Sequence, residues 1–125
     1  MNKELFEKGL AVRREVAGES YVDAALKNAD DFTMPMQELV TEFCWGAVWT
    51  RPDLDRRSRS ILNLGMLAAL NRQDELAGHI RGALTNGVTK AEIRECLLQV
   101  AVYAGMPAGM SSFKTARQVF ADLGV

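Results

Sequence analysis

The chain has 125 residues, 48% of them hydrophobic and 25% charged, with a formal net charge of −1. This composition predicts one globular domain, 1–125, that can bury a core. The near-neutral charge gives no support for binding nucleic acid or anionic lipid, and no run reaches the roughly 18 apolar residues of a membrane span.

Every strong segment has the 3.6-residue periodicity of an α-helix, and none alternates with period two. Helices are expected over about 5–16, 21–29, 33–48, 55–71, 73–86, 89–104 and 107–123. Gly18 closes the first helix, and Arg51-Pro52 ends the third. Asn86-Gly87 reads as a helix C-terminus before the capping box Thr89–Glu92. The sequence therefore predicts an all-α fold of about six or seven helices.

The only two cysteines, Cys44 and Cys96, are far apart and each lies in an apolar helical pattern. They are typical of small buried side chains in a reducing compartment. The N-terminal residues have no apolar stretch of the kind found in signal peptides. We therefore expect a cytoplasmic protein.

The single histidine, His79, lies on one helix of a predicted helical hairpin. At 100° per residue, Arg72, Glu75 and His79 share one side of this helix, at the edge of its apolar stripe. Two interpretations are equally open: a hydrogen-bonded histidine in a helix seam, or a side chain used in proton transfer near neutral pH.

Aromatic and polar residues precede this hairpin. Glu42, Trp45 and Trp49 are spaced to share a helical face, where tryptophans suit a core or a pocket wall, and periodicity alone favours the core. Ser60 and Asn63 continue a polar edge into an otherwise apolar helix. Polar groups entering a core need partners, and an anionic ligand would supply them.

Two segments, 61–70 and 96–106, are apolar nearly all round. Such helices must be covered on every side, and a domain of this size has few residues left to do so. We expect an obligate homo-oligomer; the alternative is a monomer covered by its own terminal helices.

Several motifs together resemble the carboxymuconolactone decarboxylase family, which also contains alkylhydroperoxidase D-like disulfide reductases. The resemblance runs over nearly the whole chain. The segments that carry it are 42–64, 69–72, 79–89 and 99–107. It implies an alkylhydroperoxidase D-like (AhpD-like) orthogonal helical bundle, assembled as a hexamer or a dimer-based ring.

The reductase signature does not survive in this chain. With His79 as the fixed point, Ser60 takes the place of the glutamate, and Arg72 and Glu75 take the places of the two cysteines. A guanidinium or a carboxylate cannot replace a thiolate nucleophile, so the thiol chemistry is absent.

The resemblance implies decarboxylation of 4-carboxymuconolactone to 3-oxoadipate enol-lactone, in the protocatechuate branch of the β-ketoadipate pathway. This small dicarboxylate lactone contains its own electron sink, so neither a metal nor an organic cofactor is expected. His79 is then the proton donor or oxyanion stabiliser, with Glu42 or Glu75 orienting it. The expected substrate contacts are Arg51 and Arg72 as carboxylate anchors, Trp45 and Trp49 as the pocket wall, and Ser60 and Tyr103 as hydrogen-bond donors.

The chain departs from this family at Ala47, where relatives often have glutamate, and at Ala104, where they tend to have cysteine. Two alternatives follow. The chain acts on another small carboxylated lactone, or in antioxidant defence without a thiol pair; or it is a non-catalytic oligomeric helical module.

Overall fold

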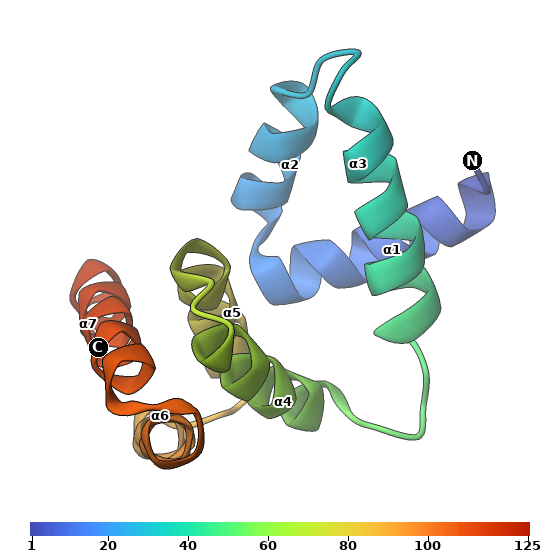
Figure 1. Ribbon diagram of the computed structural model, residues 1–125. Coiled ribbons are helices and arrows are strands. Elements are labelled where there is room, and N and C mark those ends of the chain that lie inside the picture. Colours follow the sequence, from blue (N-terminus) through green and yellow to red (C-terminus); the bar gives the residue numbers. More distant parts are fainter. The chain divides into compact units, whose positions relative to one another are not determined.

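A computed structural model describes residues 1–125 as an all-α protein (Figure 1). Its elements are α1 (Lys3–Ala17), α2 (Glu19–Lys27), α3 (Met34–Leu39), the π-helix η1 (Val40–Val48), α4 (Arg56–Ala69), α5 (Gln73–Thr85), α6 (Lys90–Ala104) and α7 (Met106–Leu123). The predicted fold class is confirmed. None of these helices is both long and apolar enough to cross a membrane.

The chain forms two compact units, unit 1 (Met1–Asp55) and unit 2 (Arg56–Val125). Each is described below by itself, and the expectation of one domain over 1–125 stays a prediction. The helix ends predicted from glycine positions are confirmed in both units. Gly18, with φ of 101°, ends α1, and Gly87, with φ of 88°, follows the C-terminus of α5.

Unit 1 is built on the packing of α1 against η1. A cluster of four buried side chains forms its core, contributed by Val12, Val16, Trp45 and Trp49. The two tryptophan rings stack with centroids 4.7 Å apart. The core interpretation of this pair is therefore confirmed.

The predicted third helix differs from one regular α-helix. After α3 the backbone changes to a π-helix, and the N–H of Trp49 donates to the carbonyl of Cys44, five residues back, at 3.0 Å. Such segments are rare and often occur at functional sites. A π-helix has a wider turn than an α-helix. Assignments of residues to one helical face at 100° per residue therefore do not apply beyond Val40.

Unit 2 contains four helices. α4 packs on α5 and α6, and α7 packs on the same two helices, so the α4–α5 seam and the α6–α7 seam lie on opposite sides of the unit. The core between them consists of apolar side chains, among which Leu64, Leu76, Ile80, Ile93 and Leu97 are fully buried.

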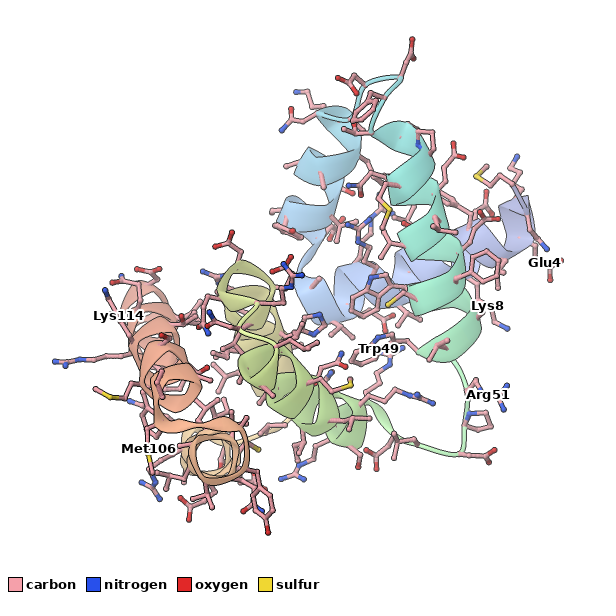
Figure 2. The ribbon with its side chains drawn as sticks, viewed as in Figure 1. Glu4, Lys8, Trp49, Arg51, Met106 and Lys114 are labelled. Atoms are coloured by element: carbon pink, nitrogen blue, oxygen red, sulfur yellow. The ribbon has the colours of Figure 1, made fainter.

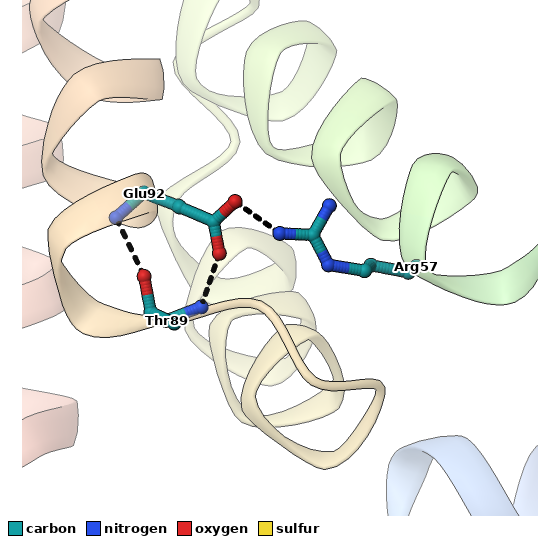
Figure 3. Close-up of polar contacts among 3 residues, drawn as sticks. All are labelled: Arg57, Thr89 and Glu92. Carbon is teal, nitrogen blue, oxygen red and sulfur yellow. Dashed lines mark hydrogen bonds and ion pairs between the residues drawn. The ribbon is translucent and has the colours of Figure 1, made fainter.

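The α5–α6 turn is fixed by the predicted capping box. The Thr89 hydroxyl accepts from the N–H of Glu92, and the Glu92 carboxylate accepts from the N–H of Thr89 (Figure 3). The same carboxylate pairs with the guanidinium of Arg57 on α4. The Arg57 hydrogen bond, aided by those of Thr89, lowers the pKa of Glu92 to about 2. The start of α6 is thereby tied to the start of α4.

The two apolar segments that were predicted to need covering, 61–70 and 96–106, remain partly exposed to solvent in the single chain. On α4, Leu62 is 53% and Met66 46% exposed, and on α6, Val102 is 72% exposed. Intervening side chains such as Leu64 and Leu97 are fully buried. Each helix therefore buries one apolar face in unit 2 and presents a second one.

The α1–η1 contact predicts a sharp difference between two glycines. A Cβ on Gly9 would lie 2.0 Å from the carbonyl oxygen of Thr41, whereas a Cβ on Gly78 in α5 would meet nothing within 4 Å. Gly9→Ala should lower the free energy of unfolding by about 3 kcal/mol or more, because backbone cannot move aside cheaply. Gly78→Ala should raise it by about 0.5–1 kcal/mol. Urea denaturation measures both, and equal midpoints would contradict the packing described.

Candidate active site

The candidate site centres on His79, which is partly buried on α5 and faces α4. Its Nδ1 atom lies 3.5 Å from Nδ2 of Asn63. An amide nitrogen can only donate a hydrogen bond, so in this arrangement Nδ1 accepts and the neutral ring carries its proton on Nε2. At 3.5 Å this is a long contact, which orients the ring more than it stabilises the fold.

Burial lowers the pKa of His79 below its ordinary 6.5, and the carboxylate of Glu75, one turn earlier on α5, opposes this only in part. The ring is therefore uncharged at neutral pH. A neutral imidazole with its proton on Nε2 can donate a hydrogen bond to a developing oxyanion, but it has no surplus proton to transfer. Of the two predicted roles for His79, this environment favours the oxyanion stabiliser.

Ser60 lies one turn before Asn63 on α4 and is fully buried. Its hydroxyl accepts a hydrogen bond of 2.9 Å from the side chain of Asn86, the residue that caps the C-terminus of α5. The α4–α5 seam thus contains two asparagine contacts, Asn63 with His79 and Asn86 with Ser60. The prediction that Ser60 donates to substrate stays a prediction.

Arg72 and Glu75 lie at the start of α5. Arg72 is the residue before the first turn, where its carbonyl accepts from the N–H of Leu76 at 2.9 Å, and its side chain is exposed. Glu75 is also exposed and acts on His79 only through its charge. Together these residues place a cation, an acid and an imidazole at the N-terminal half of one helix.

The other expected residues of the first half of the chain belong to unit 1. Glu42 is buried, and its carboxylate accepts from the backbone N–H of Asn2. Trp49 lies at the end of η1, and Arg51 follows it in an exposed position (Figure 2). The convergence of Arg51 and Arg72 on one ligand stays a prediction.

Tyr103, in the last turn of α6, is 81% exposed. It belongs to the uncovered apolar face of that helix, and its role as a hydrogen-bond donor to substrate stays a prediction.

The thiols are held in their unreactive form. Burial raises the pKa of both Cys44 in unit 1 and Cys96 in unit 2, which disfavours the nucleophilic thiolate. Both cysteines are free and half-buried, where the sequence predicted small buried side chains. No group of three or more His, Cys, Asp or Glu side chains is placed to hold a metal ion.

Sequence reasoning did not assign two residues of the α4–α5 seam, Asn63 and Asn86, to the site. A signal existed for Asn63, which interrupts an apolar helix at the polar edge that begins with Ser60. Asn86 was interpreted only as part of a helix C-terminus, and nothing in its local sequence indicates the partner of its side chain.

The fold and this seam define an all-α protein with one neutral histidine and no thiol pair. The family model described as the carboxymuconolactone decarboxylase family matches residues 35–118. The chain belongs to this family.

Curated relatives agree with this membership. A 4-carboxymuconolactone decarboxylase of Acinetobacter baylyi is 43% identical over 124 residues, 99% of this chain and 92% of the relative. A nitrosuccinic acid decarboxylase of Metarhizium robertsii is 46% identical over 98% of this chain and 86% of its own length. An uncharacterized 15.0 kDa protein of Paracoccus denitrificans is 30% identical, over 72% of this chain and 67% of its own length. The chain is an enzyme of the carboxy-lyase class.

The environment of His79 predicts its titration. In the wild-type protein, the ring should titrate below 6.5, because burial disfavours the imidazolium. Asn63→Asp should raise this pKa, because a carboxylate beside Nδ1 favours the charged ring, whereas the isosteric Asn63→Leu should not raise it. Since the chain has a single histidine, its ring proton resonances report the titration without ambiguity. A wild-type pKa at or above 6.5 would contradict the burial described.

Proposed function

We propose that this protein is a cytoplasmic, cofactor-independent decarboxylase of 4-carboxymuconolactone that forms 3-oxoadipate enol-lactone, the reaction of the protocatechuate branch of the β-ketoadipate pathway. The observation that carries the proposal is the neutral, oriented imidazole of His79 at the α4–α5 seam. The 43% identity to a 4-carboxymuconolactone decarboxylase over nearly both chains supports this choice of substrate.

The reaction needs a hydrogen-bond donor more than it needs a base. When the carboxylate leaves the γ-carbon as carbon dioxide, its electron pair moves through the ring double bond to the lactone carbonyl and forms a dienolate. The Nε2–H of His79 donates to this developing oxyanion. A preorganised donor stabilises such charge strongly, because it needs no reorganisation as the charge forms.

Protonation of the α-carbon completes the reaction. If the neutral imidazole gave up its only proton it would become imidazolate, which is far too basic for that role near neutral pH. In our proposal the α-carbon therefore takes its proton from solvent. The negative charge of Glu75 offsets part of the lowering of the His79 pKa by burial. Glu42 is kept as the alternative to Glu75 for orienting His79.

Binding a dianion requires cations. We assign the two carboxylates of the substrate to Arg51 and Arg72, because a guanidinium can bind a carboxylate through two parallel hydrogen bonds. Each such charge-assisted contact contributes roughly 1.5–3 kcal/mol. The hydroxyls of Ser60 and Tyr103 complete the proposed contacts.

The stacked Trp45 and Trp49 remain assigned to the pocket wall, although both are also part of the core of unit 1. A tryptophan can do both, because its large ring packs on one side and can present an edge on the other.

A second substrate has a specific observation in its favour, the 46% identity to a nitrosuccinic acid decarboxylase. Nitrosuccinic acid carries a nitro group and a carboxylate on the same carbon, so loss of carbon dioxide moves the electron pair into the nitro group as a nitronate. This substrate is also a dicarboxylate with an internal electron sink. It makes the same demands on His79 and the two arginines.

Comparison of kcat/KM for the two substrates, followed as carbon dioxide release, tests the proposal. We expect the lactone to be the better substrate, and His79→Ala to lower kcat for it by roughly 10²–10³-fold, the usual effect of losing an oxyanion donor. His79→Gln should recover part of this loss, because an amide N–H can still donate. The Cys44→Ser, Cys96→Ser double variant is the control and should retain turnover.

Each other outcome has a definite meaning. A higher kcat/KM for nitrosuccinate would replace the first substrate with the second. Near-full activity of His79→Ala would remove His79 from the mechanism, and loss of activity on removing the thiols would indicate a thiol-dependent reaction instead.

We also propose that the protein is a closed homo-oligomer, a hexamer or a dimer-based ring. The exposed apolar faces of α4 and α6, which include Leu62, Met66 and Val102, support it, because monomers rarely expose contiguous apolar surface.

Sedimentation equilibrium at micromolar concentration should find no folded monomer. Val102→Glu, which places a charge at a residue 72% exposed in the single chain, should shift the distribution toward smaller species. A folded wild-type monomer would contradict the proposal.

A further inference from the structure

A cavity of about 630 Å³ lies in unit 2 between α6 and α7. This is the size range of sites for small organic molecules. Its floor is apolar and is formed by Ile93, Leu97, Phe113, Ala116 and Phe120. None of the residues of the α4–α5 seam lines it, and it lies on the opposite side of the unit.

Positive charge surrounds this floor. The charged residues that line the cavity are Lys90, Arg94, Lys114 and Arg117, and no acidic residue lines it. Arg94 pairs with Glu95 at 3.2 Å.

The remaining cations differ in their partners. The ammonium group of Lys90 donates to the main-chain oxygen of Val125 at 3.3 Å and lies 4.9 Å from the centre of the Phe120 ring. Lys114, which projects from α7 (Figure 2), and Arg117 make no ion pair. Lys114 and Arg117 are therefore two cations without an acidic partner at the border of the apolar cavity.

We propose that this cavity binds an aromatic monocarboxylate, with its ring on the apolar floor and its carboxylate at Lys114 and Arg117. Each half of the cavity selects one half of the ligand. A neutral aromatic compound would leave the two cations without a partner, and a compact inorganic anion would leave the exposed parts of Phe113 and Phe120 uncovered.

The same reasoning separates this site from the one at His79. The proposed substrate of the enzyme is a dianion with little apolar surface, which suits paired arginines and not a floor containing two phenylalanines. The cavity is thus a second binding site, and its test does not depend on the decarboxylation proposal.

A matched pair of probes tests the proposal on the full-length protein. 1-Anilinonaphthalene-8-sulfonate carries an anionic group on an aromatic body, and N-phenyl-1-naphthylamine has the same ring system without the charge. Fluorescence titration should show tighter binding of the anion, and 2-naphthoate, the carboxylate probe, should displace it. The Lys114→Gln, Arg117→Gln double variant should bind the anion roughly tenfold more weakly, with binding of the neutral probe unchanged. Lys8→Gln, which removes one cation from unit 1, is the control and should bind as the wild type does.

A second variant tests the floor without touching the charges. Ala121→Trp places a large side chain among the lining residues and should abolish displacement by 2-naphthoate while turnover persists. Equal affinity for the two probes, or unchanged binding of the anion in the double variant, would overturn the proposal. Binding that appears only when the oligomer dissociates would also overturn it, because another copy would then occupy the cavity.

Discussion

The α4–α5 seam imposes the constraint on which the candidate site depends, because polar groups entering this seam must find hydrogen-bond partners inside it. Ser60 is fully buried next to a core that includes Leu64 and Ile80, where an unpaired hydroxyl would be costly. Asn86 supplies the partner for Ser60, and the seam leaves no buried side-chain polar atom without one. These contacts set the register of the two helices, and the register brings Asn63 to His79.

The state of the imidazole follows from this seam and limits the chemistry. Since burial keeps the ring neutral, it serves reactions that create an oxyanion better than reactions that need a strong acid. Both substrates named for the two curated decarboxylases satisfy this condition, because a lactone carbonyl and a nitro group each accept the electron pair released with carbon dioxide. The two reactions therefore make the same electronic demand, although their substrates have little in common except two carboxylates.

The sequence predicts the helices well because their ends are encoded locally. Gly18, Asn86-Gly87 and the Thr89–Glu92 capping box each mark an end that the structure confirms. The π-helix Val40–Val48 was missed because it depends on the fit of η1 against α1, where Gly9 approaches the carbonyl of Thr41, a contact between residues far apart in sequence. The partner of His79 was missed for the same reason, although the polar edge of α4 was visible.

The loss of the reductase signature agrees with the state of the two thiols in the structure. A thiol relay needs two cysteines with lowered pKa beside the histidine, whereas Cys44 and Cys96 both have a raised pKa. In the corresponding places, by resemblance, the chain has the guanidinium of Arg72 and the carboxylate of Glu75, both exposed at the start of α5. A helix that would otherwise present nucleophiles thus presents fixed charges, which bind and orient an anion but cannot exchange electrons with it. The same scaffold then supports a reaction whose electrons come from the substrate itself.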